Sequence, residues 1–141
     1  MIIESLSRKS KAFFINAHRA ANHMYEEGVP YEAHLELTAD IARSFAHISG
    51  LDAYNTELAI SAAWGHDAVS DARINHNDIA RGLSSRDLAE ICCNLCEDVW
   101  GKNRDARNSI EYYKRIASNP ISHYVKLCER AANIEWGLSR Q

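Results

Sequence analysis

The chain has 141 residues, 46% of them hydrophobic and 25% charged, and its formal net charge is −3. Such a chain is long enough to bury its own hydrophobic core, and its composition excludes disordered, collagen-like and low-complexity proteins. The slightly acidic balance offers no positive surface for duplex nucleic acid, and no run reaches the roughly 18 apolar residues of a membrane span. We therefore expect one domain over residues 1–141, with neither duplex nucleic acid nor a membrane as its partner.

The first residues and the cysteines bear on the cellular compartment. Residues 1–5 lack the basic and apolar regions of a secretory signal, so we expect a cytoplasmic protein. Cys93 and Cys96 form a CxxC motif, but the second cysteine pair of a zinc ribbon is missing. We interpret these two, with Cys92 and Cys128, as reduced core residues, and a redox or zinc role is the alternative.

Apolar residues recur at steps of three and four along most of the chain, which is the spacing of amphipathic helices. The expected helices cover about residues 6–24, 31–49, 56–69, 84–100, 106–117 and 122–136, with a short helical turn at 77–81. No convincing alternating strand is present, so the expected fold class is all-α, a compact bundle of about six helices. Residues 58–64 are almost entirely small or apolar, and this predicts that the third helix lies at the centre of the bundle.

Four polar residues interrupt the apolar patterns of these helices. His66 and Asp67 end the central helix, His34 lies near the start of the second, and Glu129 lies within the last. Burying such groups costs free energy unless they are satisfied, and a divalent cation would satisfy all four. Two nitrogen and two carboxylate ligands suit manganese, iron, cobalt or zinc better than magnesium or calcium. Capped helix ends and hydrogen-bonded polar residues explain the same pattern without a metal, so both interpretations stay open at this point.

Three segments, in this order, resemble the HD phosphohydrolase superfamily. They read Gly-Val-Pro-Tyr-Glu-Ala-His, Ala-Trp-Gly-His-Asp-Ala-Val-Ser-Asp and Val-Lys-Leu-Cys-Glu-Arg-Ala-Ala-Asn-Ile. The closest resemblance is to the hydrolase domain of RelA/SpoT-type alarmone enzymes and their small stand-alone relatives, and it covers about residues 25–134. It implies an HD-type domain that hydrolyses the 3′-pyrophosphate of a (p)ppGpp-like nucleotide by a metal-activated water.

The resemblance also implies a set of metal ligands. His34, His66 and Asp67 match the first three ligands of the family, and Glu129 occupies the position of the fourth, which is normally an aspartate. The longer side chain of Glu129 leaves three possibilities: a shifted metal, coordination through a water, or a weakened fourth position. Mn²⁺ is the expected cofactor, with Fe²⁺, Co²⁺ or Zn²⁺ as alternatives.

Five further positions match catalytic or substrate-binding regions of the family. Asp71 matches the second residue of a catalytic Glu-Asp pair, whereas Ser70 replaces the first and is unsuited to act as a base. The resemblance thus assigns proton handling at this catalytic pair to Asp71 or to a relayed water. Asn133 and Lys126 match residues beside the last ligand and are expected to bind substrate. Tyr25 stands near the position of an arginine that packs on guanine, and it is expected to stack on a purine.

The entrance of the expected pocket departs from the family pattern. Where the family has Arg-Lys-x-Gly, this chain has Tyr25-Glu26-Glu27-Gly28, which replaces positive charge with negative charge. Two alternatives therefore remain: an HD-type (deoxy)nucleotide phosphohydrolase with another substrate, or a degenerate HD domain that binds a nucleotide for regulation. We interpret the histidines at 18, 23, 47 and 123 as surface or packed structural residues. The sequence predicts no particular oligomeric state.

Overall fold

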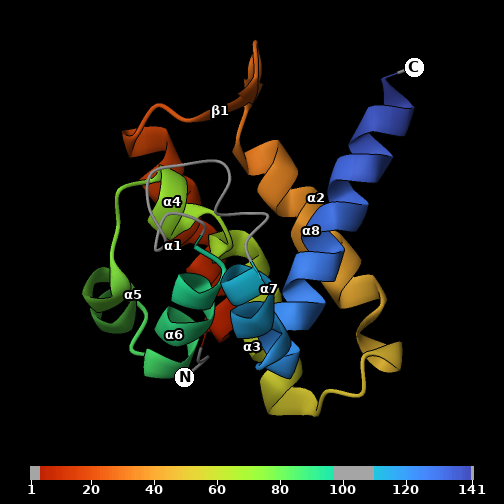
Figure 1. Cartoon of the computed structure of the whole chain (residues 1–141). Coiled ribbons are helices and arrows are strands. Elements are labelled where there is room, and N and C mark those ends of the chain that lie inside the picture. The colour runs from red at the N-terminus through yellow and green to blue at the C-terminus, as the bar shows by residue number, and fades with distance from the viewer. Residues whose placement is uncertain (1–3, 97–109, 141) are drawn as a thin grey trace.

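The computed structural model describes residues 4–96 and 110–140, and it confirms the all-α class (Figure 1). A short 3₁₀ turn (Ala46–Ile48) follows the second helix, and one small hairpin joins the first helix to the second. The helices are α1 (Leu6–Ala20), α2 (Glu32–Ser44), α3 (Ala53–Gly65), α4 (Ala68–Asp71), α5 (His76–Gly82), α6 (Arg86–Asn94), α7 (Ile110–Ala117) and α8 (Pro120–Ser139).

Helix α3 is the central helix, as its apolar sequence predicts. Every residue from Leu58 to Gly65 is buried, and α1, α2, α6 and α8 all pack against α3. Gly65 allows α1 to approach closely, because a Cβ atom built on it would lie 2.5 Å from Cζ of Phe14. A bulkier residue would push α1 away from the end of α3, where the candidate metal ligands begin.

Several helix ends differ from the sequence-based expectation. The first helix stops at Ala20 rather than near residue 24, and Asn22 then takes a left-handed conformation with φ of 56°. The second stops at Ser44 rather than near residue 49 and continues as the 3₁₀ turn. The third begins three residues early, because the side chain of Asp52 accepts a hydrogen bond from the backbone N–H of Asn55 and caps it. It also ends at Gly65, so residues 66 and 67 lie in a break before α4 rather than inside one continuous helix.

The expectation of no strand is wrong for residues 24–30. Strands β1 (Met24–Glu26) and β2 (Val29–Pro30) pair antiparallel, with Met24 opposite Pro30 and Glu26 opposite Val29. Gly28 makes the tight reversal, since its φ of 79° is a conformation that favours glycine. Strands this short carry no alternating pattern that a sequence could reveal.

The caps of the later helices also differ from those that the sequence predicts. Residues 84–87, Ser-Ser-Arg-Asp, resemble a capping box in the sequence. The capping box instead forms between Asn75 and Asp78 at the start of α5, and the side chain of Ser85 caps α6. Helix α8 begins at Pro120, capped by the side chain of Asn119, and runs beyond the expected end at residue 136. Helix α6 ends at Asn94, before the expected end at residue 100, and the expected helix start at residue 106 lies outside the described residues.

The four cysteines are free thiols, and Cys92, Cys96 and Cys128 are buried while Cys93 is half-buried. Their placement agrees with the interpretation of small core residues. Within residues 4–96 and 110–140, no helix has both the length and the apolar character needed to cross a membrane.

Candidate metal centre

The start of α2 and the end of α3 bring three of the four expected metal ligands together. The Nε2 atoms of His34 and His66 lie 3.1 Å apart, and Nε2 of His66 lies 2.9 Å from Oδ2 of Asp67. One ligand atom from each residue lies within 4.8 Å of the other two. Separations of about 3 Å are those of neighbouring ligands around an ion with bonds of about 2.1 Å.

Hydrogen bonding orients His66 toward this point. Its Nδ1–H donates to the backbone carbonyl of Ala63 at 2.7 Å, one turn earlier in α3, so Nε2 is the nitrogen that faces His34 and Asp67. Histidine ligands in metalloproteins are commonly held by such a bond from the second ring nitrogen. His34 is 2% exposed, and its Nδ1 has no hydrogen-bond partner within the described chain.

The charges of the three residues depend strongly on one another. Burial lowers the pKa of His34 to about 4, so this ring is neutral. Burial alone would also lower the pKa of His66, but the adjacent Asp67 carboxylate outweighs it and raises the pKa to about 9. The pKa of Asp67 stays below its usual range despite burial, because His66 lies beside it.

The protein thus holds a proton at the point where the three ligand atoms converge. A divalent cation can replace that proton, because two imidazoles and a carboxylate are a donor set that first-row divalent metals bind. The residues present therefore fit a metal ion.

Tyr31 also contacts the carboxylate of Asp67, and the motif that contains Tyr31 does not by itself predict this contact. Its hydroxyl donates a hydrogen bond to Oδ2 of Asp67. Burial and the negative charge of Asp67 raise the pKa of Tyr31, so the hydroxyl keeps its proton and remains a donor. Its ring stacks on His23 and His18, with centroid distances of 3.9 and 4.7 Å.

His18 and His23 therefore lie close to the site as well. They contact each other through their Nδ1 atoms at 2.9 Å, and burial lowers the pKa of His18 to about 4. The interpretation of His18 as a packed residue is correct, since it is 1% exposed, but its proximity to the candidate metal ligands was not predicted. No spacing rule links residues 18 and 23 to residue 31; the turn after α1 and the hairpin bring them together. His47 and His123 are exposed, as expected.

Glu129, the fourth expected ligand, is not a member of the group of three. Its carboxylate instead forms an ion pair with Nζ of Lys126 at 3.3 Å and accepts a hydrogen bond from Nδ2 of Asn133 at 2.9 Å. Its negative charge still contributes to the raised pKa of His66, so it lies near the ligands. Among the three possibilities left by the sequence, this arrangement favours a weakened or water-mediated fourth position.

The ring of Tyr25 packs against His34, one of the three candidate ligands. Its ring lies nearly parallel to that of His34, with an interplanar angle of 4° and a centroid distance of 4.6 Å. Its hydroxyl donates to Oδ1 of Asn133 at 2.8 Å, and its ring meets Trp136 edge-on at 5.2 Å. One face of Tyr25 is thus covered by the ring of His34, which leaves the other face for a purine to stack on.

Ser70 and Asp71 follow the ligands on α4 but differ in their surroundings. The hydroxyl of Ser70 donates to Sγ of Cys96 at 3.5 Å, which directs it toward the end of α6. Asp71 is exposed, its backbone N–H donates to the carbonyl of Asp67 at 2.8 Å, and its charge contributes to the raised pKa of Tyr31. Of this expected catalytic pair, Asp71 is the residue with a carboxylate near the site.

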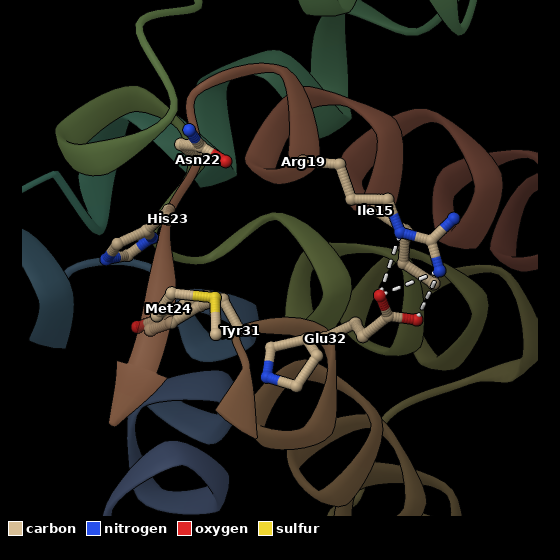
Figure 2. A pocket seen from close by; sticks show the side chains of 8 residues that line it. Ile15, Arg19, Asn22, His23, Met24, Tyr31 and Glu32 are labelled. Atoms are coloured by element: carbon tan, nitrogen blue, oxygen red, sulfur yellow. Dashed lines mark hydrogen bonds and ion pairs between the residues drawn. The ribbon is translucent and has the colours of Figure 1, made fainter. Parts of the chain in front are cut away.

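A hollow of about 370 Å³ lies between the end of α1, the hairpin and the start of α2 (Figure 2). Tyr31 and His23 line it, whereas His34, His66 and Asp67 do not. Arg19 also lines the hollow, but both of its hydrogen bonds to Glu32, at 2.8 and 2.9 Å, neutralise its charge (Figure 2). Tyr31 thus separates this hollow from the three ligands.

Comparisons of the chain with protein-family models, with curated proteins and with solved structures gave no match.

Proposed function

We propose that this protein is an HD-type, metal-dependent phosphohydrolase that acts on a nucleotide, with a (p)ppGpp-like 3′-pyrophosphate as the first substrate to test. One observation carries the proposal: Nε2 of His34, Nε2 of His66 and Oδ2 of Asp67 meet within hydrogen-bonding distances. These are the three positions that the resemblance to the HD superfamily assigns to metal ligands. Residues 32 positions apart in the chain would not share a buried polar point by helix capping alone.

His34, His66 and Asp67 would hold the metal, and Mn²⁺ is the ion to test first. A bound divalent ion would lower the pKa of a water from 15.7 toward about 7 and neutralise charge on phosphoryl oxygens. The protein's own residues orient the ligands: the Ala63 carbonyl fixes the ring of His66, and the Tyr31 hydroxyl holds the carboxylate of Asp67.

Asp71 is the proposed proton acceptor, because it is exposed and follows Asp67 by one helical turn. Asn133, Lys126 and Tyr25 are the proposed substrate contacts, and they already form a connected polar group around Glu129. The nucleotide would therefore bind beside this polar group, next to the three candidate metal ligands.

The charges near the site favour the first alternative, an HD-type (deoxy)nucleotide phosphohydrolase with another substrate, because the cations there are already paired with carboxylates. Lys126 is paired with Glu129, and Arg140 is paired with Glu26 at the hairpin. The sequence offers four further cations that could hold a phosphate, Arg43, Lys102, Arg104 and Arg107, and no motif selects one of them. Arg43 is exposed and paired with Asp40. The other candidates, at positions 102, 104 and 107, lie outside the described residues.

The test combines metal analysis with a nucleotide panel. We expect purified protein to bind Mn²⁺ and to hydrolyse at least one nucleotide in an ion-exchange chromatography assay that includes (p)ppGpp and deoxynucleotides. His66→Ala and Asp67→Ala should lose bound metal and turnover together. His47→Ala is the matched control, because His47 is exposed on the 3₁₀ turn.

Three outcomes separate the candidate functions. Full activity in His66→Ala would refute the site. Hydrolysis of another nucleotide but not of (p)ppGpp would select the first alternative. A metal-free, inert protein that still binds a nucleotide would select the degenerate regulatory domain, which Ser70 in place of a glutamate and the pairing of Glu129 with Lys126 both favour.

A further inference from the structure

Helix α8 presents a row of exposed apolar side chains. Leu127, Ile134 and Leu138 are 56, 65 and 63% exposed, and Ala131 between them is also exposed. Single exposed apolar residues are ordinary on a protein surface, whereas a contiguous apolar patch of a few hundred Å² is often functional.

The spacing of these residues is that of a coiled-coil seam. Steps of four, three and four residues place Leu127 and Ile134 at d positions and Ala131 and Leu138 at a positions of a heptad. The side of α8 that faces its own core carries Ile121, Val125, Cys128 and Ala132 instead. At about 100° per residue, the centres of these two sides are separated by about 120° around the helix axis, so the row faces away from the core.

We propose that this row, residues 127, 131, 134 and 138 of α8, is the interface with a second copy of the same chain, the two helices lying parallel about a twofold axis. The charged residues beside the row indicate both the partner, a second copy, and the parallel arrangement of the two helices. Arg130 and Glu135 flank the row at a g and the following e position, which face each other across a parallel pair. Each copy would thus supply Arg130 to Glu135 of the other, which gives two ion pairs per dimer.

The antiparallel arrangement does not use these charges. It would set Arg130 opposite Gly137 and Glu135 opposite Cys128, and Cys128 is buried in its own core. The parallel arrangement also places Ala131 against its own copy, and two small side chains let the helices approach closely.

The size of the row sets the expected strength. Three side chains exposed to this degree supply on the order of 300 Å² per copy, which is less than the roughly 600 Å² per partner of a small stable interface. The dimer is therefore weak and depends on protein concentration. Trp136 and Arg140 hold the C-terminal turns of α8 against the hairpin, through the ring of Tyr25 and the carboxylate of Glu26, while Ile134 and Leu138 stay exposed and accessible to a partner. Figure 1 shows α8 at the edge of the bundle.

Sedimentation equilibrium of the full chain, from about 10 µM to about 1 mM, tests the association. We expect a monomer–dimer equilibrium in wild type and a monomer throughout this range in Ile134→Glu. Ile48→Glu, at a 69% exposed apolar residue on the 3₁₀ turn, is the control and should associate like wild type. A wild-type monomer at all concentrations, or unchanged association in Ile134→Glu, overturns the proposal.

A charge exchange tests the direction. Arg130→Glu and Glu135→Arg should each weaken association several-fold, and the double variant should restore it, because the exchanged pair is again complementary. Circular dichroism of each variant establishes that α8 is still folded. If neither single charge variant changes association while Ile134→Glu abolishes it, the parallel arrangement is overturned.

Discussion

The substitution Tyr31→Phe isolates the support that Asp67 receives. It removes the hydroxyl that donates to Oδ2 of Asp67 and keeps the ring that stacks on His23 and His18. Helix packing around the site should therefore persist, and only the orientation and basicity of one metal ligand should change.

The size of the effect follows from the kind of bond that is lost. A hydrogen bond to a charged group contributes about 1.5–3 kcal/mol, and loss of an outer partner of a metal ligand typically lowers metal affinity about 10- to 100-fold. Asp67 is 19% exposed, so water compensates only in part for the missing hydroxyl. We expect Tyr31→Phe to lower Mn²⁺ affinity within that range.

The assay is calorimetric titration of metal-free protein with Mn²⁺, together with thermal unfolding. Tyr124→Phe is the matched control, since its hydroxyl donates to the carbonyl of Ala42 at 2.7 Å, away from the ligands. That variant should lose some stability and no metal affinity. Wild-type affinity in Tyr31→Phe, while Asp67→Ala loses the metal, would refute the supporting role and leave the site in place. Absence of binding in wild type would refute the site itself.

Four further outcomes test the site and its scaffold. Asp71→Asn should keep Mn²⁺ affinity and lose about 10²- to 10⁴-fold in kcat at saturating metal, and a near-wild-type kcat would contradict its role as base. Glu129→Gln should change Mn²⁺ affinity less than about 10-fold, because Glu129 is not in the ligand group, and a loss above about 100-fold would reveal direct coordination. With a pKa of about 9, His66 is protonated at pH 7, so metal binding should release about one proton. Mn²⁺ affinity should therefore rise about tenfold per pH unit toward pH 9. Calorimetric titrations in two buffers of different ionisation enthalpy measure the proton release, and its absence would contradict the assigned charge. Gly65→Ala should lower the free energy of unfolding by about 1–3 kcal/mol, because its Cβ would overlap Phe14. Gly137→Ala, whose Cβ meets no atom within 4 Å, should raise the free energy of unfolding by about 0.5–1 kcal/mol. Denaturant titration measures both changes, and equal effects of the two alanines would refute the packing argument.

The sequence predicted that His34, His66 and Asp67 come together, but it did not predict the residues that support them or the separate place of Glu129. His34, His66 and Asp67 stand at helix ends next to apolar runs, where an unsatisfied polar group is costly and therefore conspicuous. Tyr31 lies in the segment that resembles the family turn, but its contact with Asp67 could not be predicted, because a tyrosine hydroxyl can find a partner in many ways. The sequence also could not show that the Glu129 carboxylate pairs with Lys126 and Asn133, because its direction depends on which cation and amide lie beside it in the fold.

The sequence by itself determined the all-α class and the central place of α3. Helical periodicity is a local property, and a helix that is apolar on every side, as residues 58–64 are, can only be buried. The tertiary structure alone decided where the helices end, that residues 24–30 form a hairpin, and which side chains surround the three ligands. A helix end depends on a cap or a close contact that competes for the backbone, as at Asp52 and Gly65, and such competition is settled by residues distant in the chain.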